Sequence, residues 1–212
     1  MKNRYTHQII ARLVAVAAAV GFMAAVAAQD KKQVTVDLSE IRKGLTELQA
    51  RVTENAAALE AVKKAAKSNS ELKPAYNKFE QSFKKLETQI NTLRSQATQM
   101  RARADDHYKA WQNELSKMGN PKLREKAQNR FADAKEEFDE IIVLAGEAKQ
   151  QLEPYMADLR DVNQYLGVDL SPEAVKSLNN TIWKLGNKSG SVIASIQHVN
   201  AQIGKALEAQ PQ

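Results

Sequence analysis

Apolar side chains recur in alternating steps of three and four residues through almost all of the sequence after residue 36. Between residues 37 and 66 these positions are Leu38, Ile41, Leu45, Leu48, Val52, Leu59, Val62 and Ala66. Asn55 occupies the one clearly polar position of that series. Such spacing keeps one side of an α-helix apolar and is typical of helices that pack side by side as coiled coils. The pattern therefore predicts an all-α fold.

Helix-ending residues divide this pattern into four segments. The first covers residues 37–66, with Asp37 expected to cap its start. The second extends to Met118, and the third begins at the sequence Gly119–Asn120–Pro121. There we expect a left-handed glycine to end one helix, while Asn120 caps the next and Pro121 takes its first position. Gly167 is expected to end the third segment, and Ser171–Pro172 begins the fourth.

The second and third segments are each about 45 residues long, or roughly 68 Å as helices, and a tight turn joins them. We expect an elongated antiparallel bundle of four helices, up-down-up-down, built on this central hairpin, whose tip extends past the other two helices. Asn55 in the first segment can fix the register of packing if it is buried. The alternative is that the first helix is only weakly buried and tolerates a polar residue there. The alternative is a three-helix core to which residues 38–66 are only loosely attached.

Residues 1–28 resemble a secretory signal peptide. Basic residues near the start precede an Ala-rich apolar stretch, and small residues end it, so cleavage is expected between Ala28 and Gln29. An uncleaved anchor is the alternative, although the apolar run of 16 residues is shorter than the roughly 20 that span a bilayer. A linker is expected at 29–36 and a single helical domain at 37–210. This predicts a periplasmic or secreted protein.

The chain has no cysteine, which excludes disulfides, thiolate metal sites and a lipid-modified cysteine. Its formal net charge is +6. Removal of the leader takes away three of the 31 basic residues and none of the 25 acidic ones, which leaves +3. Because both signs are interleaved along the mature chain, nucleic acid is not expected as a partner.

Several short motifs resemble a family of exported bacterial coiled-coil proteins that is known only as a domain of unknown function. They are Met100–Arg103, Tyr108–Leu115, Asn120–Arg124, Pro154–Asp161 and Tyr165–Pro172. The resemblance covers nearly all of the mature chain. It implies a helical fold and export, and it brings no activity, cofactor or catalytic residue with it.

The sequence contains only weak indications of a metal site or of acid–base catalysis. Asp105–Asp106–His107 lacks the Glu-x-x-His motif of di-iron bundles, so His107 is expected to be a structural seam residue beside Trp111. No cofactor, metal or catalytic residue is expected.

The candidates for protein contact lie near the expected turn between the third and fourth segments. They are four polar residues and one aromatic residue beyond the turn: Asp158, Arg160, Asp161, Asp169 and Trp183. Calcium binding or general acid–base work by the aspartates is the alternative.

Pro154 lies inside the third segment, and Gly186 and Gly190 lie inside the fourth. Counting back from the turn near residue 169 puts Gly186 opposite Glu153, so the glycines fall beside the proline. We therefore expect a close helix–helix contact at Gly186, Ser189 and Gly190. The alternative is that the two glycines form a loose stretch of the helix.

These features predict a non-enzymatic exported protein that serves as a structural or interaction module of the bacterial envelope. Its expected partner is an envelope protein or a second copy, and a small molecule is not expected. The alternative function is peripheral binding to a membrane surface, motivated by four lysines near one end of the hairpin: Lys73, Lys78, Lys84 and Lys85. An enzyme or metal protein is a third possibility.

Overall fold

A computed structural model describes residues 36–208. Within this range the chain forms helices joined by short turns. They are a helix over residues 36–65, α2 (Asn69–Lys117), α3 (Pro121–Val168), α4 (Pro172–Ser177) and α5 (Asn179–Glu208). The expected all-α fold is confirmed for this range. The expected leader, the cleavage site at Ala28 and Gln29, and residues 29–35 and 209–210 lie outside the described residues.

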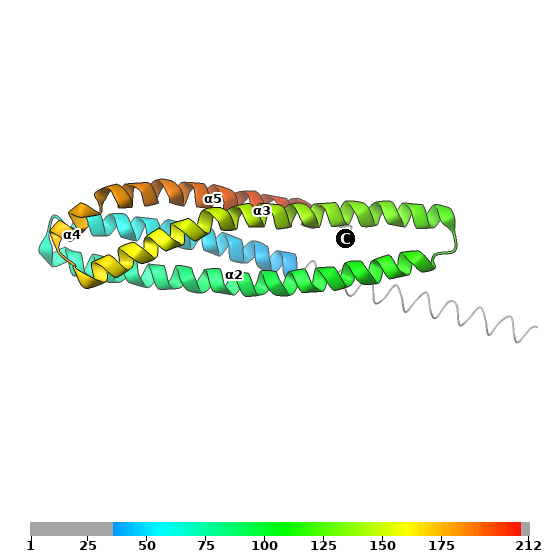
Figure 1. The fold of residues 1–212 in the computed structure, drawn as a ribbon, viewed down its shortest axis with the longest axis horizontal. Coiled ribbons are helices and arrows are strands. Elements are labelled where there is room, and N and C mark those ends of the chain that lie inside the picture. The colour runs from blue at the N-terminus through cyan, green and yellow to red at the C-terminus, as the bar shows by residue number, and fades with distance from the viewer. Residues whose placement is uncertain (1–35, 209–212) are drawn as a thin grey trace, which may run out of the picture.

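The two longest helices, α2 and α3, form an antiparallel hairpin (Figure 1). They contain 49 and 48 residues, and each is therefore roughly 73 Å long. The Tyr76 hydroxyl joins them at one end by donating to the carbonyl of Asn163 at 3.2 Å. Gly167 lies inside α3 and does not end it, and a Cβ there would lie 3.1 Å from the Tyr76 hydroxyl.

The 36–65 helix packs on α2 and α5, so the alternative of a loosely attached first segment is wrong. Its apolar residues Leu38, Ile41, Leu48, Val52, Leu59 and Val62 are all buried in the core. Asp37 forms an ion pair with Arg103 of α2 at 2.6 Å. Val36 is already helical, so Asp37 lies within the helix and is not its cap. On the α5 side, Asn200 donates to the Thr46 hydroxyl at 3.1 Å.

The expected single fourth helix is divided at Leu178 into α4 and α5. Because α4 turns the chain at the end of the bundle, α5 is shifted along α3 relative to the simple count. Lys188 pairs with Asp158 at 2.5 Å, and Gln202 donates to Glu140 at 2.6 Å. The expected position of Gly186 opposite Glu153 is therefore wrong.

The apolar core does not extend along the whole hairpin. It runs from Leu72 to Ala104 in α2 and from Phe138 to Leu166 in α3. Beyond it, the green end of the hairpin extends past the described ends of the 36–65 helix and α5 (Figure 1). We call residues 105–137, which lie beyond the core, the stalk.

Candidate functional site

The turn at the end of the stalk is defined by Asn120. Its side-chain oxygen accepts hydrogen bonds from the backbone N–H groups of Lys122 and Leu123, at 3.1 and 3.3 Å. Pro121 takes the first helical position, where a missing N–H costs nothing. Both expectations for this turn are confirmed, but Gly119 has no positive φ, so the expected left-handed glycine is wrong. The turn is therefore set by a side-chain cap.

Aromatic side chains hold the two stalk helices together. Phe131 of α3 packs edge-on against Tyr108 and Trp111 of α2, with ring centroids 5.8 and 5.4 Å apart. The Tyr108 hydroxyl donates to the carbonyl of Ala134 at 2.8 Å. The His107 ring packs against Trp111 in a tilted arrangement, with centroids 5.8 Å apart, as expected of a structural seam residue. Such contacts hold the two helices together along the stalk, where no other helix of the described range packs against them.

Burial raises the pKa of the Tyr108 phenol to about 12, and the carboxylates of Asp139 and Glu137 contribute to the same shift. The neutral phenol is the form that can donate to Ala134. The shift therefore reflects the same packing that joins the two helices.

The outer part of the stalk, residues 109–130, is called the tip. It exposes Met118 and Leu123, which are 39% and 59% accessible. Six Lys and Arg residues and two Glu residues lie in this range. Lys109 and Lys117 pair with Asp106 and Glu114. Four others form no ion pair with another residue of the 36–208 range: Lys122, Arg124, Lys126 and Arg130. The tip thus combines exposed apolar side chains with unpaired positive charge.

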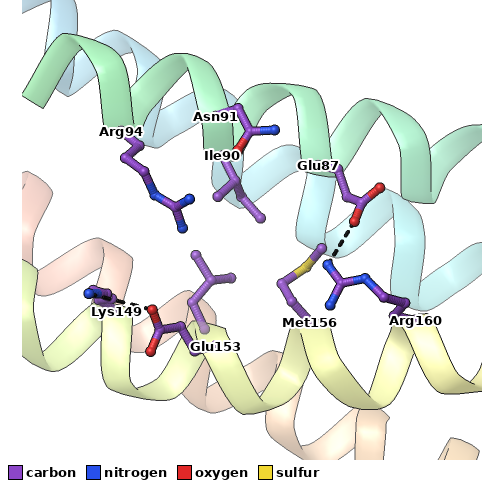
Figure 2. Close-up of a pocket in the computed structure, with 9 residues that line it drawn as sticks. Glu87, Ile90, Asn91, Arg94, Lys149, Glu153, Met156 and Arg160 are labelled. Carbon is purple, nitrogen blue, oxygen red and sulfur yellow. Dashed lines mark hydrogen bonds and ion pairs between the residues drawn. The ribbon is translucent and has the colours of Figure 1, made fainter.

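A groove of about 280 Å³ lies between α2 and α3, away from the stalk (Figure 2). Ile90, Leu152 and Met156 form its apolar part. Its rim carries the ion pair of Glu87 with Arg160 at 2.9 Å, and Lys149 with Glu153 at 3.5 Å. Its volume is at the lower limit of ligand pockets, and most of its charges are already paired. The groove therefore has fewer unpaired charged side chains available to a ligand than the tip has.

The candidate contact residues do not form one cluster. Asp158 and Arg160 are held in ion pairs to α5 and α2 respectively. Asp161 is exposed, and Asp169 ends α3, its N–H donating to the carbonyl of Tyr165. Trp183 is 62% exposed on α5. Two of the five thus have a structural role within the bundle.

The expected close packing at Gly186 and Gly190 is wrong. Both glycines are exposed, and a Cβ on either would meet no heavy atom within 4 Å. Pro154 is also exposed, and α3 continues through it as one helix. Ser189 is buried, but its hydroxyl bonds to the carbonyl of Gly186 in its own helix. The expected contact fails because the glycines lie on the solvent side of α5.

Close approaches instead occur at two glycines that the sequence reasoning passed over. A Cβ on Gly44 would lie 2.6 Å from Leu93, and one on Gly204 would lie 3.3 Å from Arg42. Both lie where the 36–65 helix meets its neighbours.

The lysines expected to support membrane binding are mostly engaged. Lys84 pairs with Glu80 at 2.8 Å, Lys85 lies 3.9 Å from Glu54, and Lys73 sits over the ring of Tyr76. The unpaired basic residues of the tip were missed. A count of charges around the predicted turn would have found them.

Among residues 36–208, no group of three or more His, Asp or Glu side chains is placed to hold a metal ion. In the same range, no helix is long and apolar enough to cross a membrane.

No curated protein and no solved structure matches this chain significantly. A family model described as "Protein of unknown function (DUF2959)" matches residues 22–208, which is most of the sequence. The motifs around Tyr108–Leu115, Asn120–Arg124 and Pro154–Asp161 all lie inside that match. The resemblance expected from these motifs is therefore confirmed, and the chain belongs to the DUF2959 family.

Proposed function

We propose that this protein is a non-enzymatic, exported helical-bundle protein of the bacterial cell envelope, and that it acts as a structural or interaction module. In this proposal the bundle is a rigid support, and the stalk is the part that it presents to a partner. The apolar leader-like segment at residues 1–28 supports export.

The stalk is the observation that carries the proposal. Residues 105–137 extend past the core, yet Phe131 contacts Tyr108 and Trp111 across the two helices. A fold that needed only stability would gain little from a braced hairpin with Leu123 exposed at its end. A stiff hairpin that reaches outward is instead suited to contact.

The bundle itself is proposed to be a four-helix, up-down-up-down arrangement in which α4 serves as a short corner. Small-angle scattering of the purified protein tests this shape. A rod based on helices of about 73 Å should have a radius of gyration of roughly 22 Å, since a rod's radius of gyration is its length divided by √12, plus a small contribution from its thickness. A value near the roughly 17 Å of a compact chain of this length would contradict the arrangement.

Photo-crosslinking in cells tests the role of the stalk. A photoreactive residue replaces the exposed Gln128 of the tip in one variant and the exposed Asn187 of α5 in a matched control. We expect a defined envelope component to be crosslinked from position 128 and not from position 187. A monomer that forms no adduct from either position, or a protein that stays in the cytoplasm, would contradict the proposed function.

A further inference from the structure

The tip and the segment of α3 that follows it carry opposite charge. Residues 109–130 contain six basic and two acidic residues, whereas residues 131–140 contain five acidic and one basic. Asp105 and Asp106 add two further carboxylates at the base of the stalk on α2. The net charge thus changes from +4 at the tip to −4 in the adjacent segment of α3.

The apolar residues of the tip lie close to the turn. Met118 immediately follows α2, and Leu123 lies in the first turn of α3. Lys122 and Arg124 flank Leu123 in the sequence and form no ion pair with the described residues. An apolar point surrounded by cations is suited to an anionic surface that has an apolar interior beneath it.

We propose that the tip binds end-on to the surface of a lipid bilayer that contains anionic lipids. Met118 and Leu123 enter the headgroup region, and Lys122, Arg124, Lys126 and Arg130 contact the anionic headgroups. The acidic segment behind the tip is repelled by the same surface, which keeps the long axis of the bundle away from the membrane plane. This inference rests on the proposed interaction role and names its partner.

End-on binding removes a difficulty of the membrane alternative. A helix that lies flat on a bilayer needs a free apolar face, but the apolar stalk residues face each other, as Tyr108, Trp111 and Phe131 show. Contact through the turn needs only the side chains at its end. For the same reason a second copy is a poorer fit, because the stalk has no apolar stripe left for another hairpin.

Vesicle co-sedimentation tests the proposal directly. The protein recovered after export is mixed with vesicles of phosphatidylcholine alone, or with 30% phosphatidylglycerol, at low and at high salt. We expect binding only to the anionic vesicles, and loss of that binding at high salt. No binding to anionic vesicles, or equal binding to neutral ones, would overturn the proposal.

Matched variants locate the contact. Lys122→Gln with Lys126→Gln removes two charges from the tip, and Lys176→Gln with Lys184→Gln removes two exposed charges near the opposite end. Leu123→Ser is matched by Val143→Ser, because the two side chains are 59% and 61% exposed. The two-charge tip variant should lower the partition coefficient by about tenfold or more, and its control by less than about twofold. Leu123→Ser should also weaken binding, and Val143→Ser should not. Equal losses in tip and control variants would overturn the end-on contact.

Fluorescence tests the orientation. Because the chain has no cysteine, a probe can be attached at Ser116→Cys beside the turn or at Asn180→Cys at the far end. Only the probe at position 116 should change its emission when anionic vesicles are added. If both probes respond equally, the bundle lies flat and the proposal is wrong. If no vesicle binds but position 128 crosslinks to a protein in cells, the lipid inference fails while the proposed function stands.

Discussion

Asn55, which is fully buried in the 36–65 helix, donates a 2.9 Å hydrogen bond from its side-chain nitrogen to the hydroxyl of Ser82 in α2. Ser82 in turn donates to the carbonyl of Phe79 at 2.8 Å. The side-chain oxygen of Asn55 has no hydrogen-bond partner among the described residues. Asn55 is therefore a buried polar residue within an apolar seam, and the alternative of a weakly buried first helix is wrong. That the Asn55–Ser82 pair fixes the register of the two helices stays a prediction.

Ser82→Ala should lower the free energy of unfolding by about 1–3 kcal/mol, because it leaves the buried Asn55 amide without its acceptor. Asn55→Leu combined with Ser82→Ala should recover that loss or exceed it, because no buried polar group then remains unpaired. Urea unfolding of the wild type, both single variants and the double variant measures the coupling. Additive effects of the two substitutions would contradict a direct interaction.

The half-buried Tyr108 and the buried Tyr155 should respond oppositely to loss of the hydroxyl. The Tyr108 hydroxyl donates to the carbonyl of Ala134, so Tyr108→Phe should cost about 1 kcal/mol of stability. Tyr155 is 0% exposed, and its hydroxyl has no partner among the described residues. Tyr155→Phe removes a desolvated polar group and should leave stability unchanged or raise it by up to about 1 kcal/mol. Thermal unfolding of both variants checks the contrast, and equal destabilisation would refute it.

The same Tyr108 contact predicts a loss of stability at high pH. Burial raises the pKa of Tyr108 from 10.0 to about 12 in the folded chain. The folded pKa lies above the unfolded one. The neutral Tyr108 phenol therefore contributes fully to the free energy of unfolding below pH 10, and this contribution is lost as the pH rises through about 12. Urea unfolding between pH 8 and pH 12 should therefore show a smaller alkaline loss in Tyr108→Phe than in the wild type. Parallel curves for the two proteins would show that this phenol does not contribute.

Local sequence signals predicted the starts of α3 and α4, whereas the glycines expected to end helices did not do so as expected. Asn120 and Ser171 each accept backbone N–H bonds from the helix that follows them, as their residue types and the adjacent prolines indicate. The seam positions were equally readable, because burial of Leu48, Val52 and Leu59 requires only that one side of the helix be apolar. Asn55 was recognisable in the sequence because it is a polar residue at a position of that apolar series.

The arrangement of neighbours was harder to predict. Val175, Leu178 and Ile182 continue the apolar spacing without interruption, so the break between α4 and α5 leaves no mark in the pattern. That break shifts α5 along α3, so that Lys188 forms an ion pair with Asp158. Gly186 and Gly190 each follow a buried seam residue, Leu185 and Ser189, and lie off the covered side of α5. The expected contact came from counting residues along α3, and a heptad pattern does not show how two helices are aligned lengthwise.

The glycines provide a final test of that assignment. Gly186 and Gly190 lie inside α5, where a Cβ would meet no heavy atom within 4 Å. Gly186→Ala and Gly190→Ala should each raise the free energy of unfolding by about 1 kcal/mol, because alanine restricts the unfolded chain and favours the helix.

Gly44→Ala is the contrasting variant, since its Cβ would lie 2.6 Å from Cδ2 and 3.3 Å from Cγ of Leu93. Leu93 is only 8% exposed and has little space to move, so this variant should instead lose about 1 kcal/mol or more through overpacking. Gly146→Ala, in the open part of α3, serves as the control for helix propensity alone. Urea unfolding of the four variants measures these differences. Destabilisation by alanine at Gly186 or Gly190 would mean that another surface covers this side of α5.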